Sequence, residues 1–150
     1  MERSDAQMHR RAFLGHVAAG AALCAGLGGC KTLNLHARLV EVASLTDGRA
    51  ALGPVGDLKI GGELKVFMPG VHGPVLVARI GEDDFRAVAI ACTHRGSDVG
   101  LVVGERKFRC TNHGAEFAFD GSVLRGPATR ELAAYTVIRE KDQLYLVVSS

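Results

Sequence analysis

Two short segments of this 150-residue chain carry the residue types of a metal site. Residues 92–96 read Cys-Thr-His-Arg-Gly and residues 110–114 read Cys-Thr-Asn-His-Gly, so each segment offers one thiolate and one imidazole. The order is Cys-x-His, then 15 residues, then Cys-x-x-His. A glycine closes each segment, as expected where a chain bends tightly around an inorganic centre. The four candidate ligands are Cys92, His94, Cys110 and His113.

The order of these residues distinguishes between the metals that they could bind. A zinc finger groups its cysteines first and its histidines second, on a hairpin and a helix, whereas Cys and His alternate here and no helix is indicated. An asymmetric two-iron centre fits better, because one iron held by two thiolates and one held by two imidazoles need one Cys and one His from each of two loops. We therefore predict a two-iron cluster, with a structural zinc-binding module as the non-redox alternative.

Short runs of β-forming residues, separated by Gly, Pro and acidic turns, predict the elements that position these segments. No stretch after Cys30 keeps a helical period for three turns, and the acidic run 82–84 indicates a solvated hairpin turn. The regular spacing predicts an all-β, antiparallel sandwich or barrel. The expected strands are 38–43, 64–68, 74–80, 85–91, 101–103, 107–110, 116–119, 134–140 and 143–148.

Both candidate segments resemble those of the Rieske iron–sulfur proteins in spacing, order and flanking glycine, and the resemblance runs from about Leu39 to Val148. Residues 121–128 are similar to the family's strand and proline loop over the cluster. The resemblance implies a Rieske-like antiparallel β-sandwich with a base, residues 35–90 and 129–150, and a small cluster-binding subdomain, about 91–128. It also implies one [2Fe-2S] cluster per chain, held by Cys92, His94, Cys110 and His113.

The mixed ligand set would tune redox chemistry. Replacing two thiolates by neutral imidazoles removes negative charge from one iron, so an added electron is repelled less and the potential rises to roughly −150 to +300 mV. In the family the ligand histidines keep one ring nitrogen exposed, so the resemblance implies that His94 and His113 couple electron and proton uptake. The predicted protein is a one-electron relay, an electron-transfer protein or oxidoreductase subunit, with no catalytic residue of its own.

The sequence departs from the Rieske subunits of respiratory quinol:cytochrome complexes at five positions. Those subunits usually carry an additional Cys in each segment, forming a disulfide, where this chain has Ser97 and Asn112. They carry Leu where this chain has Arg95, whose charge suits an acidic protein partner more than a lipid quinone. Their Ser and Tyr that donate hydrogen bonds to sulfur are replaced by Ala115 and Phe117. These departures weaken the quinol-oxidising assignment and leave cluster binding untouched.

The first thirty residues indicate a targeting segment. Arg10 and Arg11 precede an uncharged run, residues 12–29, which resembles a twin-arginine export signal. The run ends in Leu-Gly-Gly-Cys30, which resembles the lipobox of bacterial lipoproteins, and Cys24 within it is expected to be a small hydrophobic residue. We expect residues 1–30 to be an export signal or membrane anchor that is cleaved, lipidated at Cys30 or retained, and residues 31–150 to be the Rieske domain.

The charge composition and the length exclude further classes of protein. Basic and acidic residues nearly cancel, 18 against 16, and no run of Lys or Arg indicates a nucleic-acid surface. A chain of this length forms one ordinary domain. His36 and His72 belong to neither candidate segment and are expected to be surface or turn residues.

Together these features predict one-electron transfer in an exported respiratory or periplasmic redox chain, in the periplasm or on the periplasmic side of the bacterial cytoplasmic membrane. The expected partner is a redox protein, and the leader or a lipid is expected to provide membrane association. Two alternatives within the redox class stay open. One is the iron–sulfur subunit of a cytochrome bc-type complex, and the other is the small subunit of a molybdenum oxidoreductase resembling arsenite oxidase.

Overall fold

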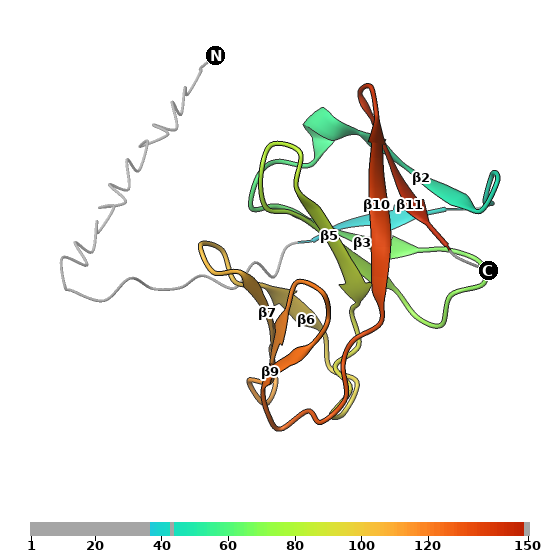
Figure 1. Ribbon diagram of the computed structural model, residues 1–150. Coiled ribbons are helices and arrows are strands. Elements are labelled where there is room, and N and C mark those ends of the chain that lie inside the picture. The colour runs from blue at the N-terminus through green and yellow to red at the C-terminus, as the bar shows by residue number, and fades with distance from the viewer. Residues whose placement is uncertain (1–36, 43, 149–150) are drawn as a thin grey trace, which may run out of the picture.

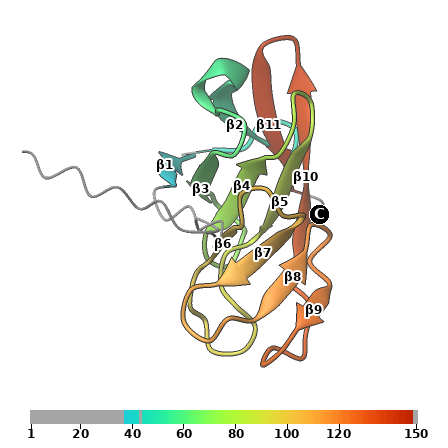
Figure 2. The ribbon, with the colours of Figure 1, turned by 90° about the vertical axis from the view of Figure 1, so that its left-hand side faces the viewer.

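Two β-sheets make up the part of the chain that the computed structural model describes, residues 37–42 and 44–148. The larger sheet has the strand order β1-β3-β4-β5-β10-β11-β2, and the smaller has the order β6-β7-β8-β9. Figures 1 and 2 show the smaller sheet at one end of the larger sheet. The predicted all-β fold is confirmed.

The strand bounds largely follow the expected runs. The larger sheet contains β1 (Arg38–Glu41), β2 (Arg49–Pro54), β3 (Glu63–Phe67), β4 (Val75–Arg79), β5 (Phe85–Ala89), β10 (Ala134–Glu140) and β11 (Gln143–Val147). The smaller contains β6 (Val99–Leu101), β7 (Lys107–Cys110), β8 (Glu116–Ala118) and β9 (Val123–Arg125). A 3-10 turn, Val55–Asp57, follows β2. No helix among the described residues is long and apolar enough to cross a membrane.

Two features of the larger sheet differ from the sequence-based expectation. Strand β2 was not expected, because its sequence RAALGP contains small residues, Gly and Pro, which are poor strand formers. It forms because Ala50 and Leu52 are buried and the strand pairs with β11. The pairing of β1 with β3 is parallel, whereas an antiparallel arrangement was expected. Every other pairing between the strands is antiparallel.

Strands β4 and β5 separate two apolar cores. Val75 and Val77 of β4 pack into one core with β2 and β11, which we call the base core. Leu76 and Ala78 face the other core, which contains Cys92 and both buried phenylalanines of the smaller sheet, and which we call the ligand core. Because both faces of β4 are buried, its sequence is a continuous apolar run rather than an alternating one. The ligand segments are thus anchored on the larger sheet.

Candidate metal centre

The first candidate segment leaves the larger sheet after β5 and turns back at once. Ala91 forms a β-bridge with Asp98, on the far side of the turn. Within it, the Cys92 N–H donates to the Ser97 carbonyl over 2.8 Å, and the Gly96 N–H donates to the Cys92 carbonyl over 2.7 Å. Gly96 has φ +76°, a left-handed conformation that favours glycine. The predicted tight turn is therefore present.

The second candidate segment turns between β7 and β8. The Cys110 N–H donates to the Ala115 carbonyl over 2.8 Å, and Gly114 has φ +70°. The two segments are joined through Asp98, whose carbonyl accepts hydrogen bonds from the Thr111 N–H and hydroxyl, both at 3.1 Å. Both loops therefore close in the same way and are fixed to one another by backbone contacts.

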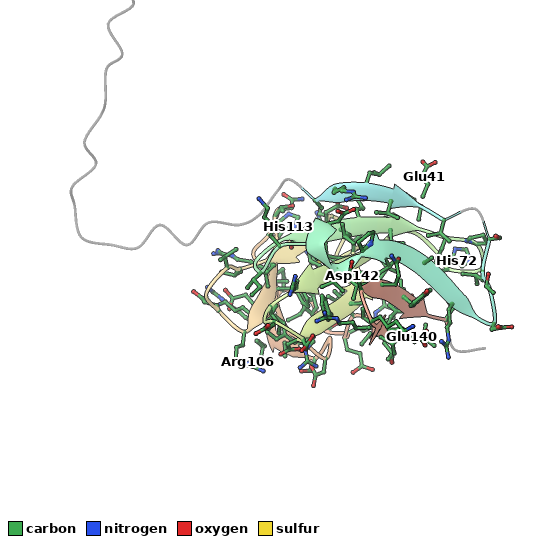
Figure 3. All side chains as sticks on the ribbon, turned by 90° about the horizontal axis from the view of Figure 1, so that it is seen from above. Glu41, His72, Arg106, His113, Glu140 and Asp142 are labelled. Carbon is green, nitrogen blue, oxygen red and sulfur yellow. The ribbon has the colours of Figure 1, made fainter. Side chains whose placement is uncertain are left out.

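These two loops bring all four candidate ligands together. The side chains of Cys92 and Cys110 are buried, at 2% and 3% exposure, and share the ligand core. The rings of His94 and His113 meet edge to face, with 4.9 Å between their centroids and 83° between their planes. His113 is exposed, and Figure 3 shows it well apart from His72. Buried sulfurs and a more accessible imidazole pair thus share one end of the protein.

Backbone amides surround both thiols. Burial raises the pKa of Cys92, and the neighbouring Cys110 thiol adds to this rise, while the His94 and Arg95 N–H groups oppose it. Burial also acts to raise the pKa of Cys110, but the N–H groups of His113 and Asn112, together with the Cys92 thiol, outweigh it and lower that pKa. Amides that donate to sulfur favour the thiolate, which is the form that binds metal.

The His94 side chain provides a direct test of whether these residues fit an iron–sulfur cluster. Its Nδ1 atom is buried and has no hydrogen-bond partner. An unsatisfied buried nitrogen costs free energy, and coordination of a metal through that nitrogen would remove the cost. No three His, Cys, Asp or Glu side chains of the described chain gather tightly enough to hold a single ion. A two-iron cluster needs only two protein ligands per iron, so the four residues fit it.

The two positions at which related subunits carry the bracing disulfide are in contact here. The Asn112 side-chain amide donates a hydrogen bond to the Ser97 hydroxyl over 3.3 Å, from the second loop to the first. The Thr93 hydroxyl donates to the Arg130 carbonyl over 2.6 Å, which ties the first loop to the chain after Pro127. Polar contacts therefore brace the loops where a covalent bond is absent.

Ala115 and Phe117 are both fully buried in the ligand core beside the two cysteines. Neither side chain has a hydroxyl, so neither can donate the hydrogen bond that Ser and Tyr offer in the related subunits. His72 lies exposed in the turn between β3 and β4, as expected. The expected leader, residues 1–30, and His36 lie outside the described residues.

Sequence reasoning did not identify two residues that hold the site together. Asp98 and Arg130 contribute backbone carbonyls, and a carbonyl is common to all residue types, so no sequence signal marks it. The side chain of Asp98 has a further role, because it forms an ion pair with Lys65 of β3 at 2.7 Å.

Comparison with known protein families gives one match that covers most of the described chain. The model of the Rieske [2Fe-2S] domain matches residues 49–136, a range that contains both loops. Among curated proteins, the chain is 35% identical over 86 residues to cytochrome b6-f complex iron-sulfur subunit 2 of Synechocystis. That alignment covers 55% of this chain and 48% of the relative. The corresponding subunit of Synechococcus strain JA-2-3B'a(2-13) is 42% identical over 53 residues, 35% of this chain and 31% of the relative. The chain thus spans about half the length, or less, of these relatives.

Comparison with solved structures also finds a Rieske protein. A cyanobacterial plasma membrane Rieske protein from Synechocystis PCC 6803 is 39% identical, with a TM-score of 0.56, and the match covers 65% of this chain and 97% of that one. The ferredoxin of carbazole 1,9a-dioxygenase from Nocardioides aromaticivorans reaches a TM-score of 0.61 at 18% identity, covering 69% of this chain and 100% of that one. The second likeness concerns the fold alone.

Proposed function

This chain belongs to the Rieske [2Fe-2S] family, and we propose that it transfers single electrons in an exported respiratory or periplasmic redox chain. Its cofactor is a [2Fe-2S] cluster, which takes up and releases one electron when bound. We assign Cys92 and Cys110 to one iron and His94 and His113 to the other. The observation that carries this assignment is the meeting of the two Cys-His loops around the unpartnered His94 Nδ1.

Some of the surrounding residues shield the cluster from water, and others leave it accessible. The buried cysteines keep water from the sulfurs, and a dry environment strengthens electrostatic effects on the cluster. The exposed side chain of His113 leaves one imidazole accessible to solvent. The same exposed end offers a partner a close approach to the cluster. Electron transfer would therefore pass through the end of the molecule that carries the histidines.

The test is spectroscopic and analytical. Loaded protein should contain two irons and two inorganic sulfides per chain, and on reduction it should give the low-average-g electron paramagnetic resonance of a cluster with mixed ligands. His94→Ala or Cys110→Ala should abolish this signal, and His72→Ala, at the exposed turn histidine, is the matched control. Unchanged spectra in either ligand variant would overturn the assignment.

The similarity to cytochrome b6-f iron-sulfur subunits supports a second candidate, a subunit of a bc-type complex. Two features argue against a quinol-binding site. Arg95 places a charged residue next to His94 in the sequence, and Ala115 and Phe117 lack the hydroxyl groups. The partner would be a redox protein: a cytochrome, a quinol-oxidising complex or a molybdenum enzyme. Isolation of the native protein with its bound partner separates these classes, because haem, quinol oxidation and molybdenum each have their own assay.

We also propose that residues 1–30 direct the protein to the periplasmic side of the bacterial cytoplasmic membrane, and that residues 91–128 act as the cluster-binding subdomain. Replacing both Arg10 and Arg11 by Lys should leave precursor in the cytoplasm. Mass spectrometry of the mature protein distinguishes the fates of the leader, because lipidation at Cys30, cleavage elsewhere and an intact Met1 differ in mass.

A further inference from the structure

Glu63 is the one charged residue among those described whose side chain is buried, at 4% exposure. It opens strand β3, and its neighbours at the next alternate positions, Lys65 and Phe67, share its side of the sheet. This side faces the smaller sheet, whereas Leu64 and Val66 point into the base core. A carboxyl group thus sits between the two sheets, where burial of a charge is costly without a partner.

The partner of Glu63 is the backbone of β6. The Leu101 N–H donates a hydrogen bond to Glu63 Oε1. Two residues along β3, Lys65 forms its ion pair with Asp98, directly before β6. Val99 of the same strand pairs with Cys110 across the smaller sheet. Glu63 therefore contacts the strand that lies beside one of the assigned ligands.

A cavity of about 130 Å³ connects these groups. Its lining includes Glu63, Lys65, Asp98, Val99 and Thr111, the residue that follows Cys110. A cavity of this size with several polar groups can hold water. The carboxyl group of Glu63 and Thr111 of the second ligand loop therefore line one cavity, whose walls combine polar and apolar side chains.

The charged groups that face Glu63 are few. On its own strand there is Lys65, and on the segment before β6 there is Asp98, and these two neutralise each other as an ion pair. On β1, which also pairs with β3, Arg38 lies opposite Leu64 and forms its ion pair with Asp57. The residues of β4 on this side are Leu76 and Ala78, and those of β6 are uncharged. Within the described residues, no cation is paired with the Glu63 carboxylate itself.

We propose that Glu63 is a proton-binding site outside the ligand set, and that its proton is coupled to the electron on the cluster. Burial raises the pKa of Glu63 to about 7, and the Leu101 N–H opposes this rise. The group therefore changes charge in the neutral range. An electron added to the cluster repels the ionised carboxylate, so reduction favours protonation of Glu63, and by linkage protonation of Glu63 favours reduction to the same extent.

The coupling rests on the proposed function, whereas the protonation of Glu63 does not. The coupling is tested by measuring the potential of the loaded protein from about pH 5 to about pH 9, in wild type, Glu63→Gln and Glu41→Gln. The amide introduced by Glu63→Gln keeps an oxygen that can accept a hydrogen bond from the Leu101 N–H, and it cannot ionise. Glu41 is an exposed glutamate at the end of β1, labelled on the rim in Figure 3, and serves as the matched control.

The wild-type and Glu41→Gln potentials should fall with rising pH through a step centred near the Glu63 pKa. Glu63→Gln should lack that step and keep the higher, low-pH potential, while any step from the ligand histidines stays in all three proteins. The missing step should correspond to about fivefold or more in the reduction equilibrium, the lower end of typical coupling between sites. Loaded Glu63→Gln with the wild-type pH profile would overturn the coupling.

A second measurement keeps the proposal testable in the wild-type chain, with or without a cluster. The infrared carbonyl band of a protonated, buried carboxyl group should disappear as the pH rises through the neutral range, and it should be absent from Glu63→Gln. A carboxyl band that titrates only in the acidic range would overturn the proton-binding site. Absence of the cluster signal from all three proteins would instead refute the proposed function.

Discussion

The base core and the ligand loops are held together by different interactions. The base core is a continuous apolar layer, in which Ala50, Val66 and Leu146 are fully buried between hydrogen-bonded strands. The ligand loops are held by hydrogen bonds to the Asp98 and Arg130 carbonyls and by the side-chain contact between Ser97 and Asn112. The comparison teaches that the base core contains none of the candidate ligands, so its packing can be changed with little effect on the cluster.

The largest effect should come from the base core. Leu146→Ala removes a fully buried side chain and should lower the free energy of unfolding by about 2–5 kcal/mol, the usual cost of such a cavity. Chemical denaturation measures this change. Leu124→Ala is the matched control, because Leu124 is 56% exposed, and it should change stability by less than about 0.5 kcal/mol. A shifted cluster spectrum in folded Leu146→Ala would break the separation between the two regions.

The next effect lies at the boundary between the two regions. Because the pKa of Glu63 is raised from 4.5 to about 7, its contribution to stability is complete below about pH 4.5 and is lost as the pH rises to about 7. The loss is on the order of 3 kcal/mol at neutral pH. The stability of Glu63→Gln should therefore change less across this window than that of the wild type. A variant as pH-sensitive as the wild type would contradict the burial of an ionisable group there.

A smaller effect concerns the potential alone. Restoring both hydroxyls, with Ala115→Ser and Phe117→Tyr, should raise the potential, because each new donor stabilises the more negative, reduced cluster. A hydrogen bond to a charged group is worth about 1.5–3 kcal/mol, and both oxidation states accept it, so only part of that energy counts. Each bond should thus add some tens of millivolts, up to roughly 100 mV. Voltammetry that finds no rise would mean that these positions do not face the cluster.

The smallest effect should come from the brace between the loops. Asn112→Ala removes the hydrogen bond to Ser97, so it should weaken the contact between the two loops by about 0.5–1.5 kcal/mol without changing global unfolding. We expect faster loss of the cluster to a chelator, with an unchanged unfolding midpoint for the base core. Ser97→Ala should have the same effect, and the double variant should lose no more than either single one. Additive effects in the double variant would show that the two side chains act independently.

Much of the fold was predictable because its signals are local. The runs 107–110 and 134–140 were predicted with the bounds that the structure gives, since β-branched and aromatic residues follow clear turn signals there. Strand β2 was not predicted because its small residues are poor strand formers, and the strand forms only by pairing with β11. The parallel pairing of β1 with β3 was also missed, because pairing direction depends on the path of the chain between them.

In the candidate site, too, local features were predictable from the sequence and long-range contacts were not. The four candidate ligands were recognised because their types and spacing are local. The contacts that hold the loops were not, because Thr93 meets Arg130, and Thr111 meets Asp98, through backbone carbonyls of distant residues. Glu63 carried no sequence signal, because an alternating strand with a charged residue predicts a solvent-facing position, and the smaller sheet covers it.

The assignment of one iron to two histidines is tested most directly by magnetic resonance of the reduced cluster. Nitrogen electron–nuclear double resonance, on protein labelled with ¹⁵N-histidine, counts the imidazole nitrogens bound to iron. The account predicts two strongly coupled histidine nitrogens in the wild type and in the His72→Ala control, from His94 and His113. A cluster with one coupled histidine nitrogen or none would contradict it.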